Sequence, residues 1–171
     1  MEPTTSQRLA DLLEVIRQTA GASNSLHALQ ERIVNAISRE LPAYDWVGFY
    51  MLDPDDSTVL VLGPYVGEAT PHVRIPIQEG ICGAAAASGS TIVVDDVNAD
   101  PRYLSCSIKT RSEIVVPIFA FGAVAGELDI DSHTAAAFGE SDRTFLEEVA
   151  RIVGAFIEAV AAAGSAARLV G

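Results

Sequence analysis

The spacing of the apolar residues changes along this chain, and that change limits the fold more than any single motif does. Near the N-terminus the apolar residues recur every three or four positions, which predicts helices over residues 9–16 and 26–41, the second ended by Pro42. The middle of the chain alternates apolar and polar residues, as β-strands do. From about Ser141 the helical spacing returns. Helices on both sides of a block of strands predict an α+β fold around a mainly antiparallel sheet, with the N- and C-terminal helices on one face.

The strands fall into two predicted hairpins. Residues 45–52 and 58–63 form the first, joined by the turn Asp-Pro-Asp-Asp at 53–56. Residues 113–121 and 124–131 form the second, around Gly122. Shorter elements lie between the hairpins: strands at 72–77 and 91–94, a helix at 84–88 after the glycine-rich segment 80–83, and a long loop at 95–112.

Composition narrows the class of protein and its partners. With 171 residues, 49% hydrophobic and 20% charged, we expect one globular domain over residues 1–171, with its core at about 6–163 and a frayed tail at 164–171. No apolar stretch reaches the ~18 residues that a membrane span needs, and residues 1–9 do not resemble a secretory signal, so we expect a cytoplasmic protein. A net charge of −12 disfavours nucleic acid and anionic membranes as partners. Small molecules or other proteins remain as possible partners. The long apolar stripe of the C-terminal helix leaves room for a homodimer contact.

Three acidic residues stand at every second position of the strand predicted at 124–131. They are Glu127, Asp129 and Asp131. Because side chains of a strand alternate between its faces, all three share one face. A solvated sheet face is the simpler explanation, and a binding site is the other. Glu113 joins them if the hairpin loop has three residues, and it lies on the opposite face from Asp129 if the loop has two; the sequence does not fix this register.

The two cysteines differ in their surroundings. Cys82 stands between glycines at the start of a predicted helix, where backbone amides would lower the pKa of its thiol; a small buried side chain is the alternative. Cys106 lies in a polar loop with Lys109 and Arg111 downstream, which is harder to explain as core. A structural disulfide is not expected in a reducing compartment, so the two thiols are either buried residues or a redox pair.

Aromatic and histidine side chains add two further candidates. Trp46 and Tyr50 share one face of a strand and are either core residues or an aromatic floor for a ligand. His133 follows the acids, but no second histidine stands near it, and two cysteines are too few for a zinc cage. We therefore predict neither a metal site nor a cofactor.

Six short segments, in this order, resemble one family. They are residues 46–50, 60–64, 73–76, 80–83, 112–117 and 128–132. Together with both cysteines they are similar to the free methionine-(R)-sulfoxide reductases, a single-domain branch of the GAF superfamily, over about residues 6–160. The resemblance implies a loop-capped pocket on one sheet face. It also implies the reduction of free L-methionine (R)-sulfoxide through a cysteine sulfenic acid and a disulfide, which a dithiol such as thioredoxin then reduces.

The resemblance also implies roles for individual residues. Cys106 matches the catalytic cysteine of the family and Cys82 a resolving cysteine. Three acids match the carboxylates that hold the substrate, and two aromatic residues match the wall around its methyl end. These residues are Glu113, Asp129, Asp131, Trp46 and Tyr50. Since the three acids converge in the family, the resemblance favours the three-residue loop, and Glu113 is the acid expected to protonate the sulfoxide.

One position departs from the family pattern. Many members carry a further cysteine ten residues before Cys82, where this chain has His72. Only Cys82 is then left to resolve the intermediate. If the other cysteine were required, turnover would stop and the protein would instead be a GAF module that senses a small molecule or the redox state.

Overall fold

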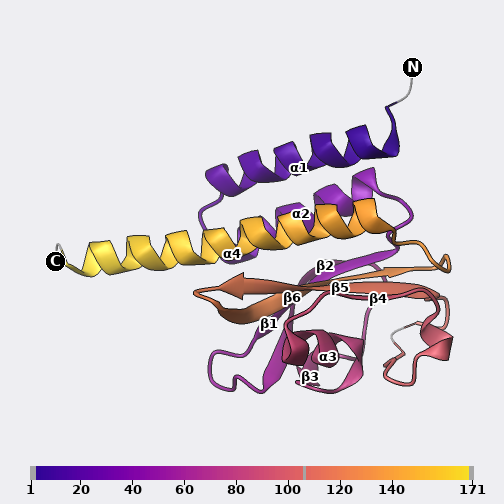
Figure 1. The fold of residues 1–171 in the computed structure, drawn as a ribbon. Helices are drawn as coiled ribbons and strands as arrows, with labels where there is room; N and C mark the ends of the chain where they lie inside the picture. The colour runs from indigo at the N-terminus through magenta and orange to yellow at the C-terminus, as the bar shows by residue number, and fades with distance from the viewer. Residues whose placement is uncertain (1–2, 106, 170–171) are drawn as a thin grey trace.

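The computed structural model describes residues 3–105 and 107–169, with side chains described as far as residue 165. Helices at both ends of this part enclose a block of strands, as the apolar spacing predicts (Figure 1). In chain order the elements are α1 (Thr5–Ala22), α2 (Leu26–Glu40), β1 (Trp46–Leu52), β2 (Val59–Val66), β3 (Arg74–Pro76), α3 (Gly80–Ser88), β4 (Ile92–Val94), the 3-10 turn η1 (Val97–Ala99), β5 (Ser112–Ala120), β6 (Ala123–Ser132) and α4 (Glu140–Leu169).

The six strands form one sheet in the order β3-β2-β1-β6-β5-β4, and each neighbouring pair is antiparallel. The predicted α+β class and both predicted hairpins are confirmed. β2 continues to Val66, beyond the predicted end at Gly63, because it stays paired with β1 as far as Val47. α3 begins at Gly80, so Cys82 lies in its first turn.

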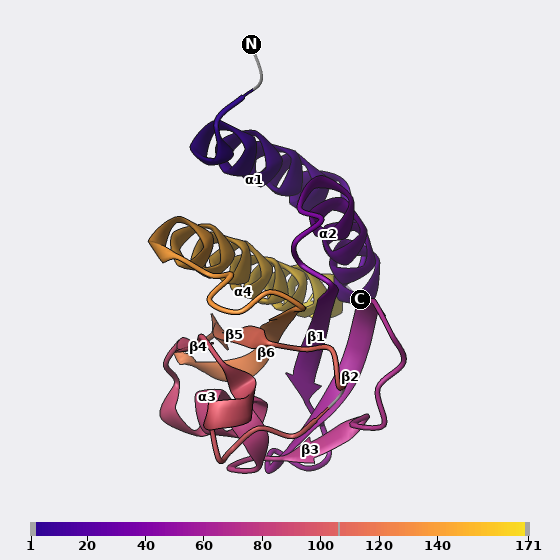
Figure 2. The ribbon, with the colours of Figure 1, turned by 90° about the vertical axis from the view of Figure 1, so that its right-hand side faces the viewer.

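The helices divide unequally between the two faces of the sheet. α1, α2 and α4 cover one face, while α3 lies on the other side, near the edge strand β3, as the two views show (Figure 1, Figure 2). The covered face builds the larger apolar core, to which α4 contributes Phe145, Val149 and Val153. The prediction that the terminal helices share one face is confirmed. The other face has a smaller apolar cluster that includes Tyr50 and Cys82.

α4 extends further than the sequence suggests. It runs as far as Leu169, whereas fraying was expected from Gly164. Its length does not make it a membrane span: within the described residues, no helix is both long and apolar enough to cross a bilayer.

The β5–β6 hairpin closes through a two-residue turn. Ala120 pairs with Ala123, and the residues between them, Phe121 and Gly122, have φ of 53° and 76°. Positive φ at both central positions is the signature of a type I′ turn, which matches the twist of the flanking strands. The Phe121 N–H donates a hydrogen bond of 2.7 Å to the Glu158 carboxylate on α4. The three-residue loop favoured by the resemblance is therefore wrong.

A β-bulge nevertheless places Glu113 with the other acids. The pairing shifts between Ile118 and Phe119, where β6 carries one extra residue. One extra residue reverses which side chains face a given side. Beyond the bulge Glu113 pairs with Asp131, and both lie on the same face of the sheet as Asp129. The expectation that a two-residue loop separates Glu113 from Asp129 fails because it did not include this bulge.

Candidate active site

The face of the sheet opposite the three large helices gathers the predicted site residues. Directly paired residues of antiparallel strands point to the same face. In the β1–β6 ladder the pairs on this face are Trp46 with Asp131, Gly48 with Asp129, and Tyr50 with Glu127. The intervening residues Val47, Phe49, Leu128 and Ile130 belong to the core under the helices. Alternation along two strands thus separates an apolar face from a face that carries carboxyl groups.

The carboxyl groups on this face are buried, so a solvated sheet face is excluded. The side chains of Glu113, Glu127, Asp129 and Asp131 are exposed by 5%, 0%, 3% and 3%. Both carboxyl oxygens of Glu127 and the Oδ1 atoms of Asp129 and Asp131 have no hydrogen-bond partner in the described part of the chain. No lysine or arginine described in the structure forms an ion pair with these three residues. Burying unpaired carboxylates costs several kcal/mol, so such groups tend to take up protons.

Burial accordingly raises the carboxyl pKa values. It raises the pKa of Asp129 to about 6, and it raises the pKa values of Glu127 and Asp131 well above their ordinary range. The charge of Asp129 adds to the shift in both neighbours. The cluster therefore retains protons at pH values where an exposed carboxyl group is ionised, and it can donate them.

The Cys82 thiol points from α3 into this cluster. Its Sγ lies 3.4 Å from Oδ2 of Asp129 and 4.0 Å from Oε1 of Glu113. Burial raises the pKa of the Cys82 thiol, and the nearby carboxylates, Asp129 first, raise it further. The prediction that the start of a helix lowers this pKa is wrong, because desolvation and three acidic neighbours outweigh the helix amides.

Cys106 lies outside the described residues, but its neighbours on both sides are placed. Nε2 of His72 lies 3.1 Å from the carbonyl oxygen of Ser105, and the Ser107 hydroxyl donates a 3.0 Å hydrogen bond to Glu68. The Lys109 ammonium pairs with the same Glu68 carboxylate at 2.8 Å. These contacts tie the segment that carries Cys106 to the connection between β2 and β3.

The predicted aromatic residues form a stack beside the acids. The ring of Trp46 stacks on Tyr50 at a centroid distance of 6.3 Å and on Tyr65 at 5.4 Å. The Trp46 indole N–H donates to the backbone carbonyl of Glu68 at 3.0 Å, and the Tyr50 hydroxyl donates to that of His72 at 2.8 Å. The stack is thus a wall of the site and also an anchor for the β2–β3 connection.

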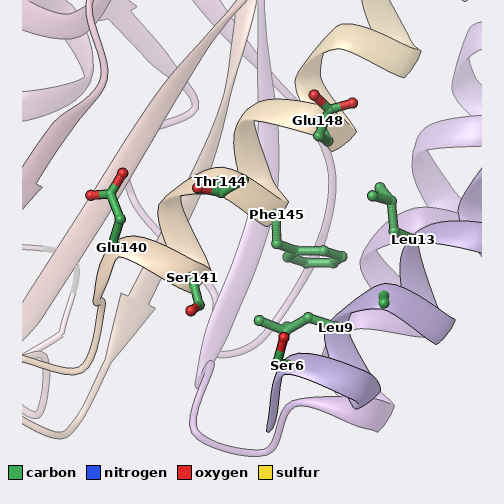
Figure 3. A pocket seen from close by; sticks show the side chains of 9 residues that line it. Ser6, Leu9, Leu13, Glu140, Ser141, Thr144, Phe145 and Glu148 are labelled. Carbon is green, nitrogen blue, oxygen red and sulfur yellow. The ribbon is translucent and has the colours of Figure 1, made fainter.

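Two of the hollows in the described part of the chain lie on opposite sides of the sheet. One of about 20 Å³ lies at the edge of the acid cluster and is lined by Trp46, Ser107 and Asp131 among others. The other, of about 280 Å³, lies between α1 and α4 (Figure 3). Figure 3 shows Leu9 and Leu13 of α1 facing Phe145 of α4 there, and neither cysteine nor histidine lines it. Of the acid cluster, Asp131 lines the first hollow, so that hollow adjoins the predicted site and the one between α1 and α4 does not.

Sequence reasoning missed two contributors to the site, Glu68 and Tyr65, and left one candidate apart from it. Glu127 lies on the face that its alternation with Asp129 and Asp131 predicts. Glu68 and Tyr65 lie in segments without a distinctive pattern, so no signal pointed to them. His133 pairs with Asp45 at 3.3 Å rather than with the thiol.

Comparison with known proteins agrees with the fold. Residues 25–157 match the GAF domain family. The structure of free methionine-R-sulfoxide reductase from Neisseria meningitidis, in complex with its substrate, superposes with a TM-score of 0.89 at 36% identity, covering 95% of this chain and 96% of that one. A protein of Burkholderia vietnamiensis described as a GAF sensor superposes with a TM-score of 0.82 at 35% identity, covering 88% and 94%.

A curated enzyme is similar over a shorter segment. Free methionine-R-sulfoxide reductase of Saccharomyces cerevisiae is 37% identical over 110 residues, which are 64% of this chain and 61% of that protein. The matched segments span only 61% to 66% of the length of two curated relatives, the yeast enzyme among them. The chain belongs to the GAF domain family, and its resemblance to the free methionine-R-sulfoxide reductases is confirmed.

Proposed function

We propose that this protein reduces free L-methionine (R)-sulfoxide to methionine, with Cys106 as the attacking cysteine and Cys82 as the resolving one. The observation that carries the proposal is the placement of the Cys82 thiol within 4.0 Å of two buried carboxyl groups, those of Asp129 and Glu113. Sulfoxide reduction needs a thiol and a proton donor together, and this face of the sheet supplies both.

The surrounding side chains suit a zwitterionic substrate. Trp46 and Tyr50 offer an apolar wall to its methyl end, and Asp129 and Asp131 offer carboxyl oxygens to its ammonium group. A bound ammonium group would also favour the ionised form of these acids. Binding would then place a positive charge beside Asp129 and Asp131, which form no ion pair with a described lysine or arginine.

The first chemical step reduces the substrate. Glu113 donates a proton to the sulfoxide oxygen, which makes the sulfur electrophilic, and the Cys106 thiolate attacks that sulfur. The sulfur–oxygen bond of the substrate breaks and the oxygen passes to Cys106. Methionine leaves, reduced by two electrons, and Cys106 becomes a sulfenic acid.

The second step resolves the sulfenic acid. Cys82 attacks the sulfur of Cys106, a disulfide forms, and the leaving hydroxide becomes water by taking up the proton that the Cys82 thiol has released. Asp129 accepts the proton of the Cys82 thiol, since its Oδ2 lies 3.4 Å away and its pKa is raised only to about 6. For this bond to form, the Cα atoms of Cys82 and Cys106 must come within about 7 Å of each other. A dithiol protein such as thioredoxin then reduces the disulfide.

A coupled assay tests the proposal. Racemic methionine sulfoxide is supplied with thioredoxin, thioredoxin reductase and NADPH, and we expect NADPH oxidation to stop when half of the sulfoxide is consumed. Cys106→Ser should abolish turnover, while Glu31→Gln, at an exposed position of α2, should not change it. Without reductant, mass spectrometry should find a Cys82–Cys106 disulfide. Normal turnover by the Cys106→Ser variant would refute the mechanism.

The alternative is a ligand-binding GAF module without turnover, and the similarity to a GAF sensor favours it. The same assay separates the two functions. A rise of the melting temperature with methionine sulfoxide, without any NADPH oxidation, would support the binding module.

A further inference from the structure

Three candidate metal ligands meet in the acid cluster. One ligand atom from each of Cys82, Glu113 and Asp129 lies within 4.8 Å of the other two, and all three side chains are buried. They come from three elements, α3, β5 and β6, so the folded sheet holds them together. Their positions are fixed by the register of the hairpin and the start of α3, rather than by flexible loops.

The separations of these atoms fit a tetrahedral zinc ion. Zinc binds thiolate sulfur at ~2.3 Å and carboxylate oxygen at ~2.1 Å, which puts sulfur and oxygen ligands ~3.6 Å apart. The observed distances from Cys82 Sγ to the Asp129 and Glu113 oxygens are 3.4 Å and 4.0 Å. Both sulfur–oxygen distances therefore lie within a few tenths of an ångström of the tetrahedral value.

An independent observation points to a cation at this place. Both carboxyl oxygens of Glu127 and Oδ1 of Asp129 are buried without a hydrogen-bond partner in the described part of the chain. Glu127 lies near enough to affect the Cys82 thiol electrostatically. A divalent ion would compensate this buried acidic charge, which no described lysine or arginine does by an ion pair with Glu127 or Asp129.

We propose that Cys82, Glu113 and Asp129 form a reversible binding site for Zn²⁺, and that the bound ion inhibits the protein. Thiolate and carboxylate together select zinc over magnesium or calcium, which need six or more oxygen ligands. Binding breaks the Cys82 S–H bond, forms a sulfur–zinc bond and releases one proton to solvent, and nothing is oxidised or reduced. Only the inhibition rests on the proposed function: a bound ion would occupy the resolving thiol and the proton donor at once.

Cobalt titration tests the binding, since Co²⁺ takes zinc sites and gives a thiolate charge-transfer band in the near-ultraviolet. The titration uses the full chain in a Cys106→Ser background, so that Cys82 is the only thiol. We expect the band to appear and to disappear when Zn²⁺ is added. Adding Cys82→Ser should remove it, Asp129→Asn should weaken the affinity at least ~10-fold, and Glu31→Gln should leave the affinity unchanged.

Any of three results would overturn the site. The band could be absent, it could persist after Cys82→Ser, or the Asp129→Asn and Glu31→Gln variants could bind with equal affinity. Circular dichroism checks the fold of each variant. If Asp129→Asn does not fold, the conservative change Cys82→Ser tests the metal site by itself.

Inhibition is measured separately in the parent protein. Methionine release is followed in a single turnover without dithiol, because dithiols bind zinc. Added Zn²⁺ should stop the release and EDTA should restore it; release that Zn²⁺ does not change would overturn the inhibition. The titration contains no sulfoxide, so it tests the metal site even if the protein is inactive as a reductase. If the protein reduces sulfoxide but shows no cobalt band, only the metal site is overturned.

Discussion

The thiol sulfur of Cys82 lies 3.4 Å from Oδ2 of Asp129, inside the sheet face that α3 covers. This contact joins the first turn of a helix to the middle of β6, two elements far apart in sequence. It puts the thiol beside a carboxyl group whose pKa is raised to about 6, so that group can accept a proton near neutral pH.

Asp129→Asn should slow the resolving step more than the first step. The amide cannot accept the thiol proton, and removal of a general base lowers a rate roughly 100-fold or more. We expect a Cys106 sulfenic acid to accumulate, which dimedone trapping and mass spectrometry of a quenched single turnover would detect. Asp131→Asn, at an acid that forms no hydrogen bond with the thiol in the described part of the chain, should raise KM instead. Equal rates of disulfide formation in Asp129→Asn and the parent would contradict this role.

The buried acids should make the protein less stable as the pH rises. Their folded-state pKa values lie above those of the unfolded chain, so between about pH 4.5 and the folded pKa the folded state binds more protons, and the free energy of unfolding falls with rising pH. Each unit of raised pKa contributes about 1.4 kcal/mol. Urea unfolding between pH 5 and pH 7.5, with EDTA present, would measure the slope.

Carboxyl groups with a lowered pKa do not affect the slope of the unfolding free energy between pH 5 and pH 7.5. Asp53 and Glu147, for example, lose their stabilising contribution only as the pH falls below the ordinary carboxyl range. Glu127→Gln should flatten the slope between pH 5 and pH 7.5. A slope of the opposite sign in the parent protein would show that the cluster is ionised in the folded state.

Gly48→Ala should disturb the aromatic wall. A Cβ atom at Gly48 would lie 2.3 Å from the ring of Trp46 and 2.8 Å from Cβ of Tyr65, so both side chains would have to move. Forcing a group into a packed site costs about 1–3 kcal/mol, and KM for the sulfoxide should rise as well. The matched control is Gly21→Ala on α1, where no heavy atom outside the helix lies within 4 Å. It should stabilise the protein by up to about 1 kcal/mol, measured by thermal unfolding.

Glu68→Gln should loosen the segment that carries Cys106 without unfolding the protein. Glu68 accepts hydrogen bonds from Ser107 at 3.0 Å and Lys109 at 2.8 Å. Exposed ion pairs contribute at most about 1 kcal/mol, so global stability should hardly change. Cleavage of residues 103–110 by a protease should become several-fold faster. In a double-mutant cycle with Lys109→Gln the two effects should not add; additive effects would show that the pair does not restrain the loop.

The sequence alone predicts those parts of this structure in which apolar and polar residues recur at a regular spacing. Alternation along β6 placed Asp129 and Asp131 on one face, and helical spacing identified the helices that cover the other. It did not predict the face of Glu113, because a bulge depends on how two strands pair and leaves no periodic signal. It also misjudged the pKa of Cys82, since that depends on carboxyl groups from β5 and β6 that only the fold brings near. Glu68 and Tyr65 escaped notice for the same reason.

The bulge in the β5–β6 hairpin takes up the one residue by which the paired part of β6 is longer than that of β5. Deleting Ala125 would remove the extra residue of β6 and leave an unbroken ladder in which Ile118 still pairs with Gly126 and Glu113 with Asp131. The carboxyl group of Glu113 would stay beside the thiol, because every other pair of the hairpin is kept. The hairpin can therefore lose that one residue without changing which side chains face the site, whatever side chains its tip carries.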